Sequence, residues 1–175
     1  ASAASARIGV DTALFTHKIE TIGEMSCNPA IGGLGKGHLV REIDALDGVM
    51  GNVADKSGIQ FRLLNRSRGP AVRGPRTQSD RALYKEHMQK TLLNYTNLTV
   101  IADPVIKFMF DKNSVVGFIC ESGKQIFCKQ LILTTGTFLN GLIHIGQKQI
   151  PAGRFDEKPS TGLSEQLSKY NIILG

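Results

Sequence analysis

A glycine-rich loop that carries one cysteine and one lysine is the part of the sequence best suited to chemistry. Residues 25–38 read MSCNPAIGGLGKGH, and an amphipathic helical pattern follows them. A glycine-rich loop before a helix offers unpaired backbone N–H groups to an anion or an electron-rich ring edge, and Lys36 adds a positive charge there. The loop is not a Walker A motif, because Gly37 follows Lys36 where Ser or Thr is required, and Ala30 occupies the place of the first glycine.

Cys27, within this loop, is the candidate catalytic residue. Neighbouring N–H dipoles and Lys36 would favour its thiolate form, which is the nucleophilic one. The alternative is a small buried residue in a tight loop, the more common role of a free cysteine. Cys120 and Cys128 lie among Phe and Ile in strand-like segments, and we interpret them as core residues. The three cysteines and four histidines show no metal-ligand spacing, so the sequence predicts no metal site.

A second candidate segment is rich in arginine. Between residues 62 and 81 the chain holds six arginines and a single acid, Asp80. Guanidinium groups suit phosphate recognition, so the segment could contact RNA or the pyrophosphate of FAD, or it could be a solvated basic face. The net charge of +6 and the pI near 9.4 fit an anionic partner without identifying it. The candidate anion or flavin-loop contacts are Lys36, Arg66, Arg68, Arg73 and Arg76.

The hydrophobic pattern predicts the elements that position these loops. Residues 1–9 are typical of the last turns of a helix closed by Gly9. The pattern predicts strands at 10–16, 58–64, 98–102 and 130–135. It predicts helices at 39–50 and 77–94, with a loop at 65–76. Between 105 and 128 it predicts a meander of three strands with turns at 111–113 and 122–124. The strand at 130–135 runs directly into Gly136, where the backbone could pass close to a bound dinucleotide.

This order of elements predicts an α/β fold. It is that of a Rossmann-like FAD-binding domain of the nucleotide-disulphide-reductase type, in which an antiparallel β-meander serves as one crossover. The first strand of such a domain, with its GxGxxG turn, is missing from the sequence. The 175 residues suffice for one domain, and no apolar run is long enough to span a membrane. An odd cysteine count without a signal peptide indicates a reducing compartment.

Several sequence motifs resemble the MnmG (GidA) family. The most specific is CNPAIGG at 27–33, followed by GKGHLV at 35–40 and EIDAL at 42–46. GIQF at 58–61, the segment from 65 to 76 and TTGTFLNG at 134–141 are similar as well. The resemblance extends essentially from end to end. The folate-dependent tRNA uridine methyltransferases share the architecture but not the CNPAIGG string.

The resemblance implies an FAD enzyme that modifies C5 of the wobble uridine in certain tRNAs with an aminomethyl or carboxymethylaminomethyl group. It implies NADH and methylene-tetrahydrofolate as further cofactors, an MnmE-type GTPase as partner, and a homodimer. Cys27 matches a cysteine to which the family assigns a nucleophilic or proton-handling role. The flavin contacts fall on Val105 and Ser160, while Thr16 stands where related folds bind the ribose.

The resemblance also implies that the chain is incomplete. The GxGxxG strand, an NADH-binding insertion and a C-terminal helical domain are not found in it, so we expect residues 1–175 to be a partial FAD-binding domain that is inactive alone. An Ala/Ser-rich start could also be a transit peptide, although its single Arg argues against that. We expect the bacterial cytoplasm, with the mitochondrial matrix as alternative. The rival functions are a generic FAD-dependent oxidoreductase acting on a small molecule and a non-enzymatic RNA-binding module.

Overall fold

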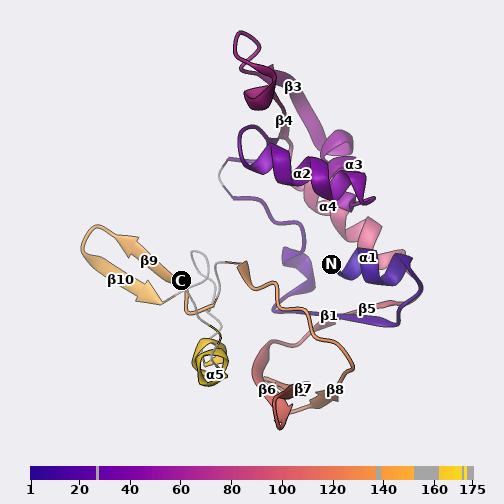
Figure 1. The fold of residues 1–175 in the computed structure, drawn as a ribbon, viewed down its shortest axis with the longest axis vertical. Helices are drawn as coiled ribbons and strands as arrows, with labels where there is room; N and C mark the ends of the chain where they lie inside the picture. The colour runs from indigo at the N-terminus through magenta and orange to yellow at the C-terminus, as the bar shows by residue number, and fades with distance from the viewer. Residues whose placement is uncertain (27, 137–138, 152–161, 171, 173–175) are drawn as a thin grey trace. The chain divides into compact units, whose positions relative to one another are not determined.

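The computed structural model describes residues 1–26, 28–136, 139–151, 162–170 and 172. The chain divides into two compact units (Figure 1). Unit 1 comprises residues 1–14 and 18–101, and unit 2 comprises residues 15–17 and 102–175. No helix in these described ranges is long and apolar enough to cross a membrane.

Unit 1 begins with a short alanine-rich helix and holds most of a parallel strand pair, of which residues 15, 16 and 102 belong to unit 2. The helix α1 (Ser2–Arg7) is closed by Gly9 at φ +89°, which confirms the predicted helix end. The strands β1 (Thr12–Thr16) and β5 (Leu98–Ala102) form a two-stranded sheet, and Thr12 N–H donates to the Asn97 carbonyl at 2.9 Å. Because this bond joins the beginnings of both strands, the pair is parallel.

The rest of unit 1 is a small antiparallel sheet with helices packed against it. Its elements are η1 (Ile19–Thr21), β2 (Ala30–Gly32), α2 (Lys36–Ala45), α3 (Val49–Ser57), β3 (Gly58–Leu64), η2 (Pro70–Val72), β4 (Gly74–Ser79) and α4 (Arg81–Leu93). The strand order is β2-β4-β3, and Figure 1 shows β3 beside β4. Buried Ile31 on β2 packs with Val53, Ala54 and Tyr84 from the helices, which fixes one face of this sheet against α3 and α4.

Two predicted helices of unit 1 have different bounds in the structure. The helix predicted over 39–50 is two helices, because Asp47 at φ +59° and Gly48 break the chain after α2. A side chain at Gly48 would clash with Ile43, so only glycine fits this turn. The second helix begins at Arg81 rather than Thr77, since residues 74–79 pair with β2 and β3 as strand β4. The loop predicted at 65–76 is therefore shorter and ends where β4 begins.

Asp80 caps the second of these helices, and this contact gives a test of the local fold. Its carboxylate accepts a hydrogen bond from Leu83 N–H at 2.9 Å. We expect Asp80→Ala to lower the free energy of unfolding by about 1 kcal/mol, because an N–H group of the first turn loses its partner. Asp80→Asn keeps an acceptor oxygen and should retain most of the stability. Urea denaturation measures both; an equal loss in the two variants would show that the cap is unimportant.

Unit 2 is built on the predicted meander. The strands β6 (Val105–Asp111), β7 (Ser114–Cys120) and β8 (Gln125–Phe127) form an antiparallel sheet in the order β6-β7-β8. Lys112 at φ +53° and Gly123 at φ +85° make the two turns, so both predicted hairpins are confirmed. The core of this unit contains Phe108, Phe118 and Cys120, with Leu163 from helix α5 (Leu163–Lys169) packed among them.

The strand predicted at residues 130–135 does not form. Ile132 is 62% exposed and Leu133 is 40% exposed, whereas the pattern predicted a buried strand. A strand in the interior of a parallel sheet needs neighbours on its edges, and no strand in the described part of the chain pairs with this segment. Instead the next strands are a separate hairpin, β9 (Leu142–Ile145) with β10 (Lys148–Pro151), which the hydrophobic pattern did not predict.

Candidate functional site

The glycine-rich loop and the arginine-rich segment lie side by side in one sheet of unit 1. Strand β2 comes from the loop and β4 from the arginine segment, and they pair antiparallel. The register places Ala30 opposite Gln78, Ile31 opposite Thr77, and Gly32 opposite Arg76. Two segments that the sequence presented as independent motifs therefore lie next to each other in one sheet.

Several N–H groups of the glycine-rich loop have partners within the protein. Gly33 N–H donates to the Pro75 carbonyl at 3.0 Å, Gly37 N–H to the Gly33 carbonyl at 2.9 Å, and Lys36 N–H to the Leu34 carbonyl at 2.9 Å. The prediction that these N–H groups are free to bind an anion is therefore wrong for these three. The loop instead holds β2 against β4, since the ladder leaves no room for a side chain at Gly32.

Positive charge at the site comes from side chains. Lys36, the first residue of α2, is exposed, and its ammonium donates to the Ala30 carbonyl at 2.9 Å, which keeps the charge beside β2. The His38 ring lies 3.1 Å from the Ala71 carbonyl, so it joins α2 to the arginine segment.

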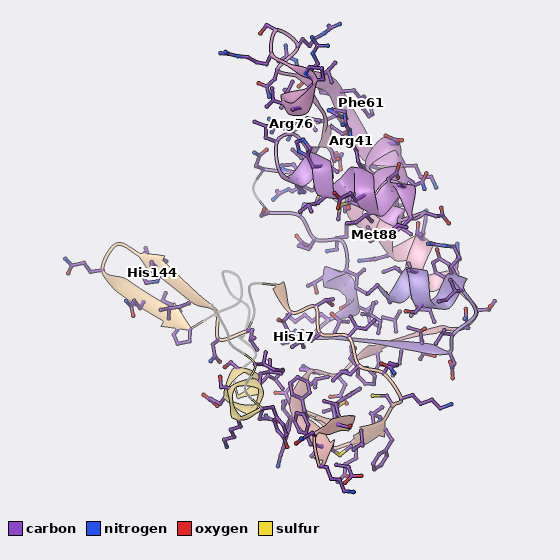
Figure 2. All side chains as sticks on the ribbon, viewed as in Figure 1. His17, Arg41, Phe61, Arg76, Met88 and His144 are labelled. Atoms are coloured by element: carbon purple, nitrogen blue, oxygen red, sulfur yellow. The ribbon has the colours of Figure 1, made fainter. Side chains whose placement is uncertain are left out.

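The four predicted arginines differ in their surroundings. Arg66 and Arg68 are exposed, and Arg73 Nε donates to the Arg68 carbonyl at 3.1 Å. Arg76 is half-buried on β4 (Figure 2). Its Nη2 donates to Asn28 Oδ1 at 3.2 Å. Within the ranges that the structure describes, none of the four forms an ion pair with a carboxylate. A bound anion could therefore contact these guanidinium groups without displacing an internal partner of opposite charge.

Comparison with known proteins identifies the family. The family described as "Glucose inhibited division protein A" (GIDA) matches residues 1–175, the whole chain. The chain belongs to the GidA family. It is 52% identical over 178 residues to the tRNA uridine 5-carboxymethylaminomethyl modification enzyme MnmG of Granulibacter bethesdensis. It is 48% identical to the mitochondrial 5-taurinomethyluridine-[tRNA] synthase subunit MTO1 of Mus musculus. Each alignment covers all of this chain but only 28% and 27% of the respective relative.

Solved structures of the family have the same fold. A structure of Aquifex aeolicus GidA matches 98% of this GidA-family chain with a TM-score of 0.91 and 46% identity, and the match covers 28% of that protein. The predicted α/β fold class is therefore confirmed. A GidA-related protein of Thermus thermophilus matches with a TM-score of 0.59 at 16% identity, covering 96% of this chain and 62% of that one, which shows the fold alone.

The cysteines of the GidA-family chain separate into two groups. Cys27 lies outside the described residues, so its catalytic role stays a prediction. Cys120 is fully buried, and burial together with the nearby Asp103 carboxylate raises the pKa of its thiol. Burial also raises the pKa of the half-buried Cys128 thiol. A raised pKa disfavours the thiolate, so both residues behave as core side chains, which confirms their interpretation from the sequence.

The predicted flavin contacts that can be placed lie in unit 2. Val105 begins β6 and packs against the core of the meander, as does Phe15, the residue before Thr16. Gly136 is exposed at φ +58°, and a Cβ built on it would have no atom within 4 Å. Ser160 lies outside the described residues. The role of these positions in binding a dinucleotide stays a prediction.

Sequence reasoning missed three polar residues of the site. Arg62 on β3 was left outside the predicted contacts, and Asn28 and Gln78 were not considered, although both amides accept hydrogen bonds from Arg76. The predicted strand at 58–64 could have drawn attention to Arg62, because it places Arg62 on the same side as Gln60. The partner of this strand, β4, overlaps the loop predicted at 65–76, so the sequence could not show which residue lies opposite Arg62.

Proposed function

We propose that residues 1–175 are part of the FAD-binding domain of a flavoenzyme that modifies C5 of the wobble uridine of tRNA. The observation that carries this proposal is the whole-chain identity of 52% and 48% to two relatives whose names both specify modification of uridine in tRNA. Because the chain spans just over a quarter of their length, the activity is that of the longer protein. The substituent is an aminomethyl or carboxymethylaminomethyl group.

Four residues would hold FAD in this proposal: Thr16, Val105, Gly136 and Ser160. When bound, FAD supplies the redox chemistry of the reaction, with NADH as the source of reducing equivalents and methylene-tetrahydrofolate as the source of carbon. The open space beside Gly136 supports its assignment, since a close approach of a nucleotide to the backbone requires a position without a side chain. The Thr16 hydroxyl would hydrogen bond the ribose.

Cys27 would act on the uridine as a covalent catalyst. Its thiolate adds to C6 of the base, and the electron pair of the C5–C6 double bond moves onto C5 and the O4 carbonyl. C5 then forms a bond to an electrophilic one-carbon unit, a base removes the C5 proton, and the thiolate leaves as the double bond re-forms. The alternative role is that Cys27 serves the flavin, and the flavin content of a Cys27→Ala protein separates the two.

The basic side chains of unit 1 would bind the anionic substrate. Lys36, Arg66, Arg68, Arg73 and Arg76 present cationic groups with no carboxylate partner among the residues described, which suits them to phosphate groups of tRNA. The full protein would work as a homodimer with an MnmE-type GTPase. Its compartment would be the bacterial cytoplasm, with the mitochondrial matrix as the alternative, since the name of the MTO1 relative is mitochondrial.

Nucleoside mass spectrometry of total tRNA tests this proposal. In a strain that lacks the gene, the C5-modified wobble uridine should disappear, and a wild-type copy of the full gene should restore it. Bulk tRNA modifications at other positions serve as the internal reference. An unchanged nucleoside profile in the deletion strain would rule out the tRNA activity.

A further inference from the structure

Two arginines face each other directly across the β3–β4 pair. The register places Arg62 opposite Arg76 and, on the same side of the sheet, Gln60 opposite Gln78. Side chains directly opposite each other in an antiparallel pair have Cβ atoms roughly 5 Å apart, and like charges in this arrangement destabilise the sheet. Figure 2 shows Arg76 on this hairpin. The pair therefore has an electrostatic cost unless an anion binds between the two groups.

No carboxylate among the described residues neutralises this pair. Arg62 is exposed and forms no hydrogen bond or ion pair with any residue that the structure describes. Arg76 donates to Asn28 Oδ1 at 3.2 Å and to Gln78 Oε1 at 3.5 Å, which are neutral amides that orient its guanidinium without cancelling its charge. The sequence contains no acid from residue 57 to residue 79.

The neighbours of the two arginines in the sheet are mostly small or polar. The residue opposite Arg76 on β2 is Gly32, which has no side chain and against which Gly37 of α2 packs. By strand alternation, Phe61 and Leu63 point to the other side of the sheet, which they share with buried Ile31. The Arg62 side carries the two guanidinium groups and the amides of Gln60 and Gln78, and its apolar members are Leu64 and Ala30.

We propose that Arg62 and Arg76 together bind one phosphate group, with the amides of Gln60 and Gln78 available to the adjacent sugar. The proposal rests on the proposed function, under which the phosphate belongs to the tRNA backbone. The same chemistry is offered by the pyrophosphate of a dinucleotide. A second copy of this hairpin is a poor occupant, because its five arginines between residues 62 and 76 would repel those of the first.

Arg62 is the informative position, since it is exposed and forms no hydrogen bond or ion pair with the residues that the structure describes. The experiment uses the full-length, flavin-loaded protein as wild type, Arg62→Ala, Arg62→Lys and the Arg62→Ala/Arg76→Ala double variant. Arg41→Ala removes an exposed charge from α2 and is the matched control. The measurements are the Kd for unmodified tRNA over a range of salt concentrations, the flavin content by absorbance, and Tm.

We expect Arg62→Ala to weaken tRNA binding about tenfold and to reduce the slope of log Kd against log salt by about one, as for one lost phosphate contact. Arg62→Lys should keep the slope, and Arg41→Ala should match wild type in every measurement.

A loss of flavin with unchanged tRNA binding would support the phosphate site and assign it to the dinucleotide. If the double variant keeps the tRNA affinity and the flavin content of the wild type, the proposed phosphate site is wrong. A change in oligomeric state alone would not rescue the proposal. Failure of the wild type to bind tRNA would overturn the proposed function instead.

Discussion

Replacing Cys27 with alanine is expected to reduce the formation of the C5-modified wobble uridine by about a thousandfold or more. Alanine cannot add to C6 of the base, and without that addition C5 of uracil is too weak a nucleophile to attack a one-carbon electrophile. The measurement is nucleoside mass spectrometry of tRNA from a deletion strain that carries the variant gene. Single-turnover assays with purified protein and unmodified tRNA give the rate directly.

Cys128→Ala is the matched control for this experiment. It removes a thiol whose pKa is raised by burial, so catalysis should be unaffected. The flavin content of the Cys27→Ala protein separates the two roles of this residue. Full flavin content with lost turnover supports attack on the uridine, whereas loss of both indicates that Cys27 serves the flavin. Undiminished turnover would remove Cys27 from the mechanism altogether.

Local patterns predicted the elements whose own residues carry a clear strand, turn or helix-end signal. The strand at 58–64 and the strand at 98–102 have the predicted bounds, because each is a run of strand-forming residues ended by polar or turn-forming positions. The meander turns at Lys112 and Gly123 were predictable for the same reason, since short polar sequences between apolar runs favour hairpins. The end of helix α1 was predictable as well, because it depends on one residue, Gly9, which adopts a positive φ at little cost.

The site itself could not be predicted, because it depends on pairing between distant segments. Strand β4 contains Gly74, Pro75 and several polar residues, a composition typical of a loop, and it becomes a strand because β2 and β3 flank it on both edges. The same dependence on neighbours explains the failed strand at residues 130–135. Its apolar sequence is that of a core strand, yet no described strand lies at its edge. Residue types therefore identified the two loops, but the register that joins them required the structure.

Gly32→Ala is expected to destabilise unit 1 by roughly 4 kcal/mol. Gly32 has φ +111°, a conformation that is strained for any residue with a side chain, and a Cβ there would overlap the Pro75 carbonyl oxygen. That oxygen accepts the Gly33 N–H bond, so moving it away breaks the junction between β2 and β4. Urea denaturation of the full protein, followed by circular dichroism, measures the change in the free energy of unfolding.

Gly9→Ala separates the two causes of this effect. Gly9 has φ +89° with no atom within 4 Å of a built Cβ, so its substitution has the backbone strain without the clash and should cost about 1 kcal/mol. Equal losses in the two variants would mean that the close approach of Gly32 to Pro75 is unimportant. If Gly32→Ala loses more free energy of unfolding than Gly9→Ala, the glycine-rich loop holds the arginine segment in place. Arg76 would then lose its position opposite Arg62 in the same variant, and binding of tRNA should fall together with stability.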